Sequence, residues 1–346
     1  MAKPVVSSTF LSFPKLLLWS LPLLLILIYT YLGAGLDLKL SSLVSLISTA
    51  EEDIASTAPI HHDSSFSPHH TLRVTEQPFT ASCIAKDKVI LINGTSPGPE
   101  LRLVEGNIYW IRVYNDMDKN NLTMHWHGLS MATSPFSDGT PGASQWPIPP
   151  NHYFDYELEI TPGNAGTYFY HSHIGFQAVT AAGPLIVEEA GKPPYEYDDE
   201  RIIALSDVFE KSNADIEEGL VSNPFQWSGE TANILVNGQG QLPGSAPSDG
   251  CKLATINVEP DTTYRFRFIG GTALSFVTLA FEDHDEMTLI EADGGYVKPI
   301  QISHLQIGSG QRFSVLFKTK SRSALAKDHF YLQMETRDRP TLTRSY

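Results

Sequence analysis

Short strand-like runs bounded by turn residues fill most of the sequence, and they restrict the fold more than any other feature. In the first half they read HTLRVTEQ, KVILING, NIYWIRVYN, HYFDYELEIT, GTYFYHSH and GPLIVEE. Alternation of apolar and polar residues over such short runs is typical of half-buried strands, and Gly, Pro, Asn and Asp between them are typical of turns. We therefore predict an antiparallel β domain over residues 71–190.

A second series of the same kind follows the break at KPPYEYDDE. Its runs are RIIALSDV, ANILVNG, ATINVEP, TYRFRFIGG, SFVTLAFED, EMTLIEADG, HLQIGSG, RFSVLFKT and HFYLQMET. Asn-Gly turns recur in ILINGT and ILVNGQ, and each is followed by a Tyr-x-x-Arg strand, YWIRVYN or YRFRFIG. The repetition predicts a second domain of the same architecture over residues 199–346, with a C-terminal end that is either complete or cut short.

The N-terminus is different, because residues Leu16–Leu36 form an uncharged apolar stretch. About 20 such residues are enough to span a bilayer, and Lys3 and Lys15 before them favour a cytoplasmic N-terminus. Small residues near the end of the stretch also fit a signal-peptidase site. Residues 1–36 are therefore predicted to be a cytoplasmic tip with a signal anchor, giving a single-pass type II membrane protein, or a signal peptide, giving a secreted protein.

Residues 37–70 are rich in Ser, Thr and His and lack a sustained strand pattern, which predicts a flexible linker. Export places the body in an extracellular or cell-surface compartment, where Asn93 in NGT and Asn121 in NLT are candidate glycosylation sites. The formal charge of −15, without clusters of Lys and Arg, excludes nucleic acid as a partner. A membrane is expected only through an uncleaved N-terminal segment, and the other partners are expected to be small molecules.

Two His-x-His pairs, in TMHWHGL and FYHSHIG, are the candidate functional residues of the first domain. Successive side chains of a strand point to opposite faces, so His125 and His127 share one face, and His171 and His173 share another. Two such strands side by side would bring four imidazoles together. The sequence therefore predicts a metal site made of these four histidines.

The ligand chemistry narrows the choice of metal. Nitrogen-only clusters without carboxylates favour copper or zinc. Structural zinc sites usually contain cysteines, and neither histidine pair has a cysteine nearby. Spacing alone leaves two arrangements open: one ion takes all four imidazoles, or the two pairs are half of a larger cluster that is completed from elsewhere.

Longer stretches of sequence resemble a known family. The runs INGTSPGPELRLVEGNIYWIRVYN, TMHWHGLSMATSPFSDGTPGASQWPIPPN and GTYFYHSHIGFQAVTAAGPLIVEE resemble the first cupredoxin domain of blue multicopper oxidases, which include laccases, ascorbate oxidases and ferroxidases. TYRFRFIGGTALSFVTLAFEDHDEMTLIEADGGYVKP and GSGQRFSVLF resemble their second domain. The resemblance spans residues 72–346, and it is strongest to fungal laccase-like and ascorbate-oxidase-like members. It implies an all-β fold of two tandem cupredoxin-like Greek-key β-sandwiches, after an N-terminal hydrophobic helix and the linker.

The resemblance also implies a role for each histidine. His125 would bind a type 2 copper, His127 and His171 would bind one copper of the binuclear type 3 pair, and His173 the other. Asp138 in SDGT matches a carboxylate that orders water near the type 2 copper and supplies protons, which suits a reaction that consumes them. The alternative for Asp138 is a plain turn residue.

The two cysteines of the chain fit the same family. In ascorbate-oxidase-like relatives the positions of Cys83 and Cys251 hold a disulfide that joins the first two domains, and an exported chain favours such a bridge. We therefore expect a Cys83–Cys251 disulfide. Trp146 stands where many relatives have a further cysteine, so a bridge from that position is not expected.

A complete member of this family has a third cupredoxin domain, which carries a type 1 copper held by two His, a Cys and usually a Met, and four more histidines of the cluster. No His-Cys-His sequence is found here. The chain is therefore expected to be a fragment, a truncated product or a member that has lost its oxidase chemistry. Its type 1 site is expected to be absent, and the chain alone is expected to be inactive.

The resulting functional prediction is a laccase-like multicopper oxidase. In its full-length form it would couple one-electron oxidation of phenol-type donors to the four-electron reduction of O2 to water, and the reducing partner is a phenolic, ascorbate-like or Fe2+ substrate. Two alternatives stay open. One is a non-catalytic copper-binding cupredoxin protein of the cell surface, and the other is a fragment of an iron(II) oxidase.

Overall fold

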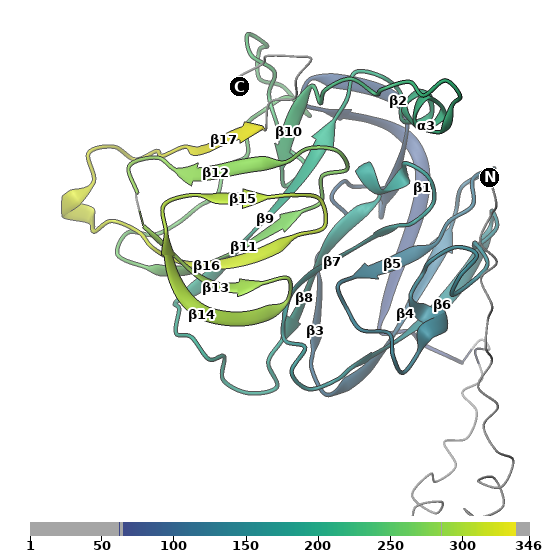
Figure 1. Ribbon diagram of the computed structural model, residues 1–346, viewed down its shortest axis with the longest axis horizontal. Coiled ribbons are helices and arrows are strands. Elements are labelled where there is room, and N and C mark those ends of the chain that lie inside the picture. Colours follow the sequence, from purple (N-terminus) through teal and green to yellow (C-terminus); the bar gives the residue numbers. More distant parts are fainter. Residues whose placement is uncertain (1–61, 63–64, 285, 337–346) are drawn as a thin grey trace, which may run out of the picture. The chain divides into compact units, whose positions relative to one another are not determined.

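The computed structural model describes residue 62 and residues 65–284 and 286–336 (Figure 1). From Ser67 onward they belong to one compact unit. This unit consists of strands, three short 3-10 helices and one described α-helix, so the predicted all-β fold is confirmed. The apolar segment Leu16–Leu36 and nearly all of the linker lie outside the described residues. Within the described ranges, no helix has the length and apolar character that a membrane crossing needs.

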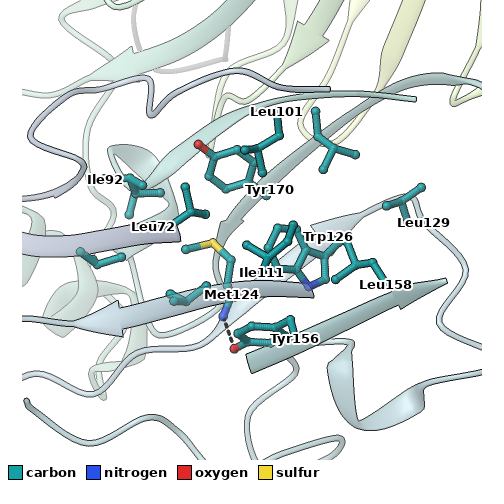
Figure 2. Close-up of a cluster of buried hydrophobic side chains, with 14 of the residues drawn as sticks. Leu72, Ile92, Leu101, Ile111, Met124, Trp126, Leu129, Tyr156, Leu158 and Tyr170 are labelled. Atoms are coloured by element: carbon teal, nitrogen blue, oxygen red, sulfur yellow. Dashed lines mark hydrogen bonds between the residues drawn. The ribbon is translucent and has the colours of Figure 1, made fainter. Parts of the chain in front are cut away.

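The first half of the unit is a β-sandwich. Its strands are β1 (His70–Ala81), β2 (Ile84–Ile92), β3 (Leu101–Val104), β4 (Asn107–Asn115), β5 (Met124–His127), β6 (His152–Ile160), β7 (Gly166–Ser172) and β8 (Ala182–Glu188). They form two four-stranded sheets, ordered β2-β1-β4-β6 and β3-β8-β7-β5. Between the sheets lies an apolar core that contains the fully buried Trp126, Tyr156 and Tyr170 (Figure 2). The Tyr156 hydroxyl accepts a hydrogen bond from the Met124 backbone N–H at 2.9 Å, which ties β5 to the opposite sheet.

The second half is another β-sandwich. Its elements are β9 (Asp199–Val208), α3 (Asn213–Val221), β10 (Asn233–Val236), β11 (Thr263–Gly270), β12 (Val277–Phe281), β13 (Met287–Ala292), β14 (Gly295–Ile302), β15 (Leu305–Ile307), β16 (Arg312–Lys318) and β17 (Leu332–Thr336). The sheets are ordered β10-β9-β11-β16-β13-β14 and β15-β12-β17. Phe266, Phe268 and Phe317 fill the core between them. The prediction of two tandem sandwiches is confirmed.

One predicted strand is wrong. The run ATINVEP, residues 254–260, alternates as a strand does but joins no sheet. Its contact with β9 is made by a side chain: the carbonyl of Asn257 accepts a hydrogen bond from Nε of Arg201 at 2.8 Å. Alternation alone does not make a strand, because a strand also needs a partner ladder of backbone hydrogen bonds.

The face of β11 turned away from the phenylalanine core is also buried, because β11 and β16 pack against β7 of the first sandwich. Arg265 and Arg267 stand on this face and are almost completely buried. Arg265 Nη2 lies 2.7 Å from Oε2 of Glu291, which is fully buried as well. Arg267 Nη1 donates to the Thr167 hydroxyl of β7 at 3.0 Å. The two sandwiches therefore meet here through a buried charged network, while Ala81 of the first sandwich packs with Val208 and Leu235 of the second in a separate apolar cluster.

A covalent link joins the sandwiches at another point. Cys83, in the turn between β1 and β2, forms a disulfide with Cys251, which precedes β11. The Cys83 backbone N–H also donates to the Gly250 carbonyl at 2.9 Å. The predicted Cys83–Cys251 bridge is thus confirmed.

Candidate metal centre

Three of the four histidines lie on neighbouring strands, His125 and His127 on β5 and His171 on β7, whereas His173 lies just past the end of β7. Strands β5 and β7 pair antiparallel, with His125 opposite His171 and His127 opposite Phe169. The three histidines and Phe169 share the outer face of the sheet, while Trp126 points to the core on the other face. The alternation that buries Trp126 therefore also directs both of its neighbours to the outer face.

Three of the four predicted histidines form a compact group. One ring nitrogen from each of His125, His127 and His171 lies within 4.8 Å of the others. His173 follows the last residue of β7 and is not a member of that group. Its ring centroid lies 5.5 Å from that of His125 and 5.8 Å from that of His171. The structure thus places three imidazoles around one point and the fourth beside them.

Backbone carbonyls orient two of these rings. Nδ1 of His125 lies 2.6 Å from the Asp138 carbonyl oxygen, and Nδ1 of His171 lies 2.8 Å from the Ser172 carbonyl oxygen. A carbonyl can only accept, so Nδ1 carries the proton in both rings and Nε2 keeps its lone pair. An available Nε2 lone pair is what a metal ligand requires.

The spacing of the two closest nitrogens fits one shared ion. Nδ1 of His127 lies 3.3 Å from Nε2 of His171. Imidazole nitrogens bind zinc at about 2.0–2.1 Å, so two of them on one tetrahedral ion of this kind lie about 3.3 Å apart. The donor set, which is imidazole alone, suits copper or zinc.

Burial keeps these imidazoles neutral. It lowers the pKa of His171 to about 3. Burial, followed by the nearby Arg312 guanidinium and the other histidines, lowers the pKa of His127 to about 4. At neutral pH both rings are therefore uncharged and able to act as ligands, since only the neutral imidazole binds a metal.

The turn that contains Asp138 presses against β5. Gly139 has φ +80°, and a Cβ there would collide with the carbonyl of Met124. The Asp138 carboxylate Oδ1 lies 3.5 Å from Nδ1 of His125, and Oδ2 accepts a hydrogen bond from the Thr140 hydroxyl at 2.5 Å. The shortest contact with His125 is nevertheless made by the backbone carbonyl of Asp138, a contact that the sequence pattern does not predict.

Phe169 is a further residue of this face that the sequence analysis missed. Its ring stacks on that of His127 at a centroid distance of 4.5 Å and lies 5.3 Å from that of His171. The sequence signal was present, because Phe169 stands two residues before His171 on the same face of β7.

The segment after His173 is held from two sides. The Gln177 side chain accepts from the Ser172 hydroxyl at 2.7 Å and donates to the Asn121 carbonyl at 3.0 Å. The Glu217 carboxylate of α3 accepts the Phe176 backbone N–H at 3.0 Å. An element of the second sandwich therefore supports the turn that follows His173, and no local sequence pattern indicates this contact.

The predicted glycosylation sites are at the surface. Asn93 and Asn121 are both exposed. Asn93 occupies a turn with φ +52°, where its side-chain oxygen accepts the Arg73 backbone N–H at 2.7 Å. Trp146, where a cysteine is common in the family, is 85% exposed.

Comparison with known proteins gives a consistent result. Two family models, both described as multicopper oxidase, match residues 73–192 and 199–344. The laccase-like multicopper oxidase 1 of Thermothelomyces thermophilus is 46% identical in an alignment of 331 positions that covers 82% of this chain and 51% of that protein. The L-ascorbate oxidase of Nicotiana tabacum is 38% identical in an alignment of 249 positions that covers 67% of this chain and 43% of that protein.

A solved structure supports the same grouping. Fet3p, a multicopper oxidase that functions in iron import, superposes with a TM-score of 0.68 at 28% identity and covers 78% of this chain and 48% of that one. The expected likeness to fungal laccase-like proteins and ascorbate oxidases is confirmed. The chain spans about half the length of the curated relatives it matches.

Proposed function

This chain belongs to the multicopper oxidase family, and we propose that it supplies four imidazole ligands to the copper cluster of a laccase-like enzyme. The observation that carries the proposal is the 3.3 Å separation between Nδ1 of His127 and Nε2 of His171. In the proposed arrangement these two rings share one type 3 copper. His125 holds the type 2 copper through Nε2, and His173, whose ring stands outside the compact group, holds the other type 3 copper.

The protein's own residues prepare this site for the reaction. Bound copper would accept electrons one at a time and pass them to O2. Burial keeps the imidazoles of His127 and His171 neutral. The carbonyls of Asp138 and Ser172 orient the rings of His125 and His171, respectively. The Asp138 carboxylate, 3.5 Å from His125, is proposed to hold a proton near the site for the reduction of O2.

Electron entry requires a second centre. A blue copper needs a cysteine thiolate, and both cysteines of this sequence are bound in the disulfide. The complete reaction, in which a phenolic, ascorbate-like or Fe2+ donor is oxidised and O2 is reduced to water, is therefore proposed for a protein in which the four imidazoles meet the remaining copper ligands. The disulfide also supports an extracellular location, to which the segment Leu16–Leu36 would direct the chain.

Copper binding by the purified chain tests this proposal. We expect colourless copper that is retained after gel filtration, and His171→Ala should lower its amount. His152→Ala is the matched control, because His152 is an exposed histidine of the same sandwich whose Nδ1 bonds the Pro150 carbonyl. Equal copper content in all three proteins, or none in the wild type, would refute the assignment.

A non-catalytic copper-binding protein is the second candidate, because neutral imidazoles such as those of His127 and His171 can bind copper whether or not an electron-entry site accompanies them. Oxygen uptake with a phenol, ascorbate or Fe2+ separates the two candidates. Uptake by a copper-loaded protein that contains this chain supports the oxidase. Copper binding without uptake in any complete protein that contains this chain supports the binding protein.

A further inference from the structure

A small cavity lies at the junction of the two sandwiches. Strands β1 and β2 of the first sandwich and β9 and β10 of the second contribute to its walls, which are mostly apolar and include Phe79, Val89, Phe209 and Leu235. The space open to the centre of a water-sized sphere is about 20 Å³. One water molecule needs about 10–15 Å³ by this measure, so the cavity admits a molecule of about that size.

Asp207 of β9 contributes a polar group to this cavity, and it is 2% exposed. Its Oδ2 accepts the backbone N–H groups of Ala273 and Leu274 at 2.7 and 2.8 Å. Ser275 also lies close to the carboxylate, but Oδ1 has no hydrogen-bond partner among the described residues. Buried polar atoms are nearly always paired, so this oxygen requires a donor from another source.

Thr180 contributes a second polar group to the same cavity. Its Oγ1 is buried, and within the described part of the chain it too has no hydrogen-bond partner. Thr180 lies in the segment that follows His173, shortly before β8. A hydroxyl can both donate and accept. One oxygen from each sandwich therefore lacks a partner at this cavity.

Charge and size restrict the occupant. The Lys86 side chain also lines the cavity, and its Nζ donates to the Lys211 carbonyl at 2.7 Å and to Asn213 Oδ1 at 3.2 Å. The Lys86 ammonium disfavours a second cation there, and the Asp207 carboxylate disfavours an anion. A neutral molecule of one heavy atom that both donates and accepts is water. Buried waters typically make about three hydrogen bonds to polar groups that lack other partners.

We propose that the cavity is a binding site for one ordered water molecule that bridges Oδ1 of Asp207 and Oγ1 of Thr180. Burial raises the pKa of Asp207. Water suits both forms of this group, because it donates to a carboxylate and accepts from a carboxylic acid. The bridge ties the segment after His173 to the second sandwich at another point besides Glu217, and it does not depend on copper.

The water itself is tested first, on the full chain without copper. Water magnetic relaxation dispersion counts the molecules that stay inside a protein for longer than its rotational tumbling time. Thr180→Val keeps the shape of the side chain but removes the hydroxyl, so we expect one long-lived water fewer than in the wild type. Thr180→Ser keeps the hydroxyl and should keep the water. Thr71→Val, at an exposed position of β1, is the matched control.

A crystal structure of the wild type decides the position of the water. We expect its oxygen about 2.5–3.0 Å from both Oδ1 of Asp207 and Oγ1 of Thr180. An empty cavity, an ion in it, or a direct hydrogen bond from Ser275 or Lys86 to Oδ1 would overturn the proposal. The same structure carries the test if Thr180→Val does not fold.

The tie to the segment after His173 has its own measurement. The Ala181 N–H donates to the Gln177 carbonyl at 2.9 Å within this segment. Loss of one hydrogen bond that holds the segment should speed exchange of the Ala181 amide hydrogen about 2–10-fold in Thr180→Val. Thr71→Val should leave this exchange unchanged. Equal exchange in Thr180→Val and the wild type would overturn the tie between the water and the segment.

Discussion

Glu291 of the second sandwich accepts hydrogen bonds from both the backbone N–H and the hydroxyl of Thr167 in the first, at 2.5 and 2.9 Å. Thr167 lies on the same face of β7 as His171, four residues away. The strand that carries a proposed copper ligand is thus anchored to the neighbouring sandwich by a buried carboxylate.

Glu291→Gln should destabilise the protein by about 3–5 kcal/mol, because it removes the carboxylate that lies 2.7 Å from the buried Arg265 guanidinium. The free energy of unfolding in urea measures this. Glu286→Gln, a change at an exposed position just before the same strand, should have little effect. A loss below 1 kcal/mol in Glu291→Gln would show that the network contributes little.

The same carboxylate should make stability depend on acid pH. Burial by itself would raise the pKa of Glu291, but Arg265 and Arg267 hold that pKa below its usual range. A lowered folded-state pKa means that stability is present above the ordinary glutamate pKa of about 4.3 and is lost as pH falls through the folded-state value. Urea unfolding at several pH values from 6 down to 3 should therefore show a shallower acid decline in Glu291→Gln than in the wild type. Identical slopes would contradict the pairing.

Loss of the disulfide should destabilise the protein by about 5 kcal/mol, since the bridge closes a loop with a sequence separation of 168. The double variant Cys83→Ser/Cys251→Ser tests this in non-reducing urea unfolding. Reductant should lower the stability of the wild type towards that of the double variant and leave the variant unchanged. An effect of reductant on the double variant would point to a cause other than the bridge.

Glu217→Ala should release the turn that follows His173. Hydrogen bonds to charged groups contribute about 1.5–3 kcal/mol, so exchange of the Phe176 amide hydrogen should speed up about 10–100-fold. Glu218→Ala is the adjacent control on the same helix and should leave this amide unaffected. Unchanged exchange in Glu217→Ala would mean that other contacts hold the turn.

Copper should stabilise the folded chain. A ligand present at 100 times its dissociation constant adds about 2.7 kcal/mol if it binds only the folded state. The melting temperature should therefore rise with copper and fall back when a chelator is added. The rise should be lost in a double variant of His127→Ala and His171→Ala. A rise of the same size in that variant would place the bound copper elsewhere.

Local patterns in the sequence predicted the strands and the shared face of the histidines, because both follow from the two-residue period of a strand. His173 shows the limit of that rule, since β7 ends at Ser172 and His173 begins the next turn. The run ATINVEP shows another, since whether a partner strand lies beside it is decided by distant parts of the chain.

The contacts that orient the rings were beyond such patterns. The backbone of Gly310 lies against the His127 ring, and the Glu217 carboxylate accepts the Phe176 backbone N–H, only because the two sandwiches pack together. The hydrophobic pattern of either sandwich alone does not indicate these contacts. The disulfide was predictable from the resemblance to a known family and from the presence of two cysteines in a chain expected to be exported.

The indole of Trp126, which is inaccessible to solvent, has a consequence for how the copper site can fail. If the pairing register of β5 shifted by one residue, the indole would turn to the face of the sheet that carries the histidines, and an imidazole would enter the apolar core. A shifted register of β5 is therefore unfavourable. Substitutions that damage the core packing around Trp126 should abolish copper binding abruptly rather than weaken it gradually.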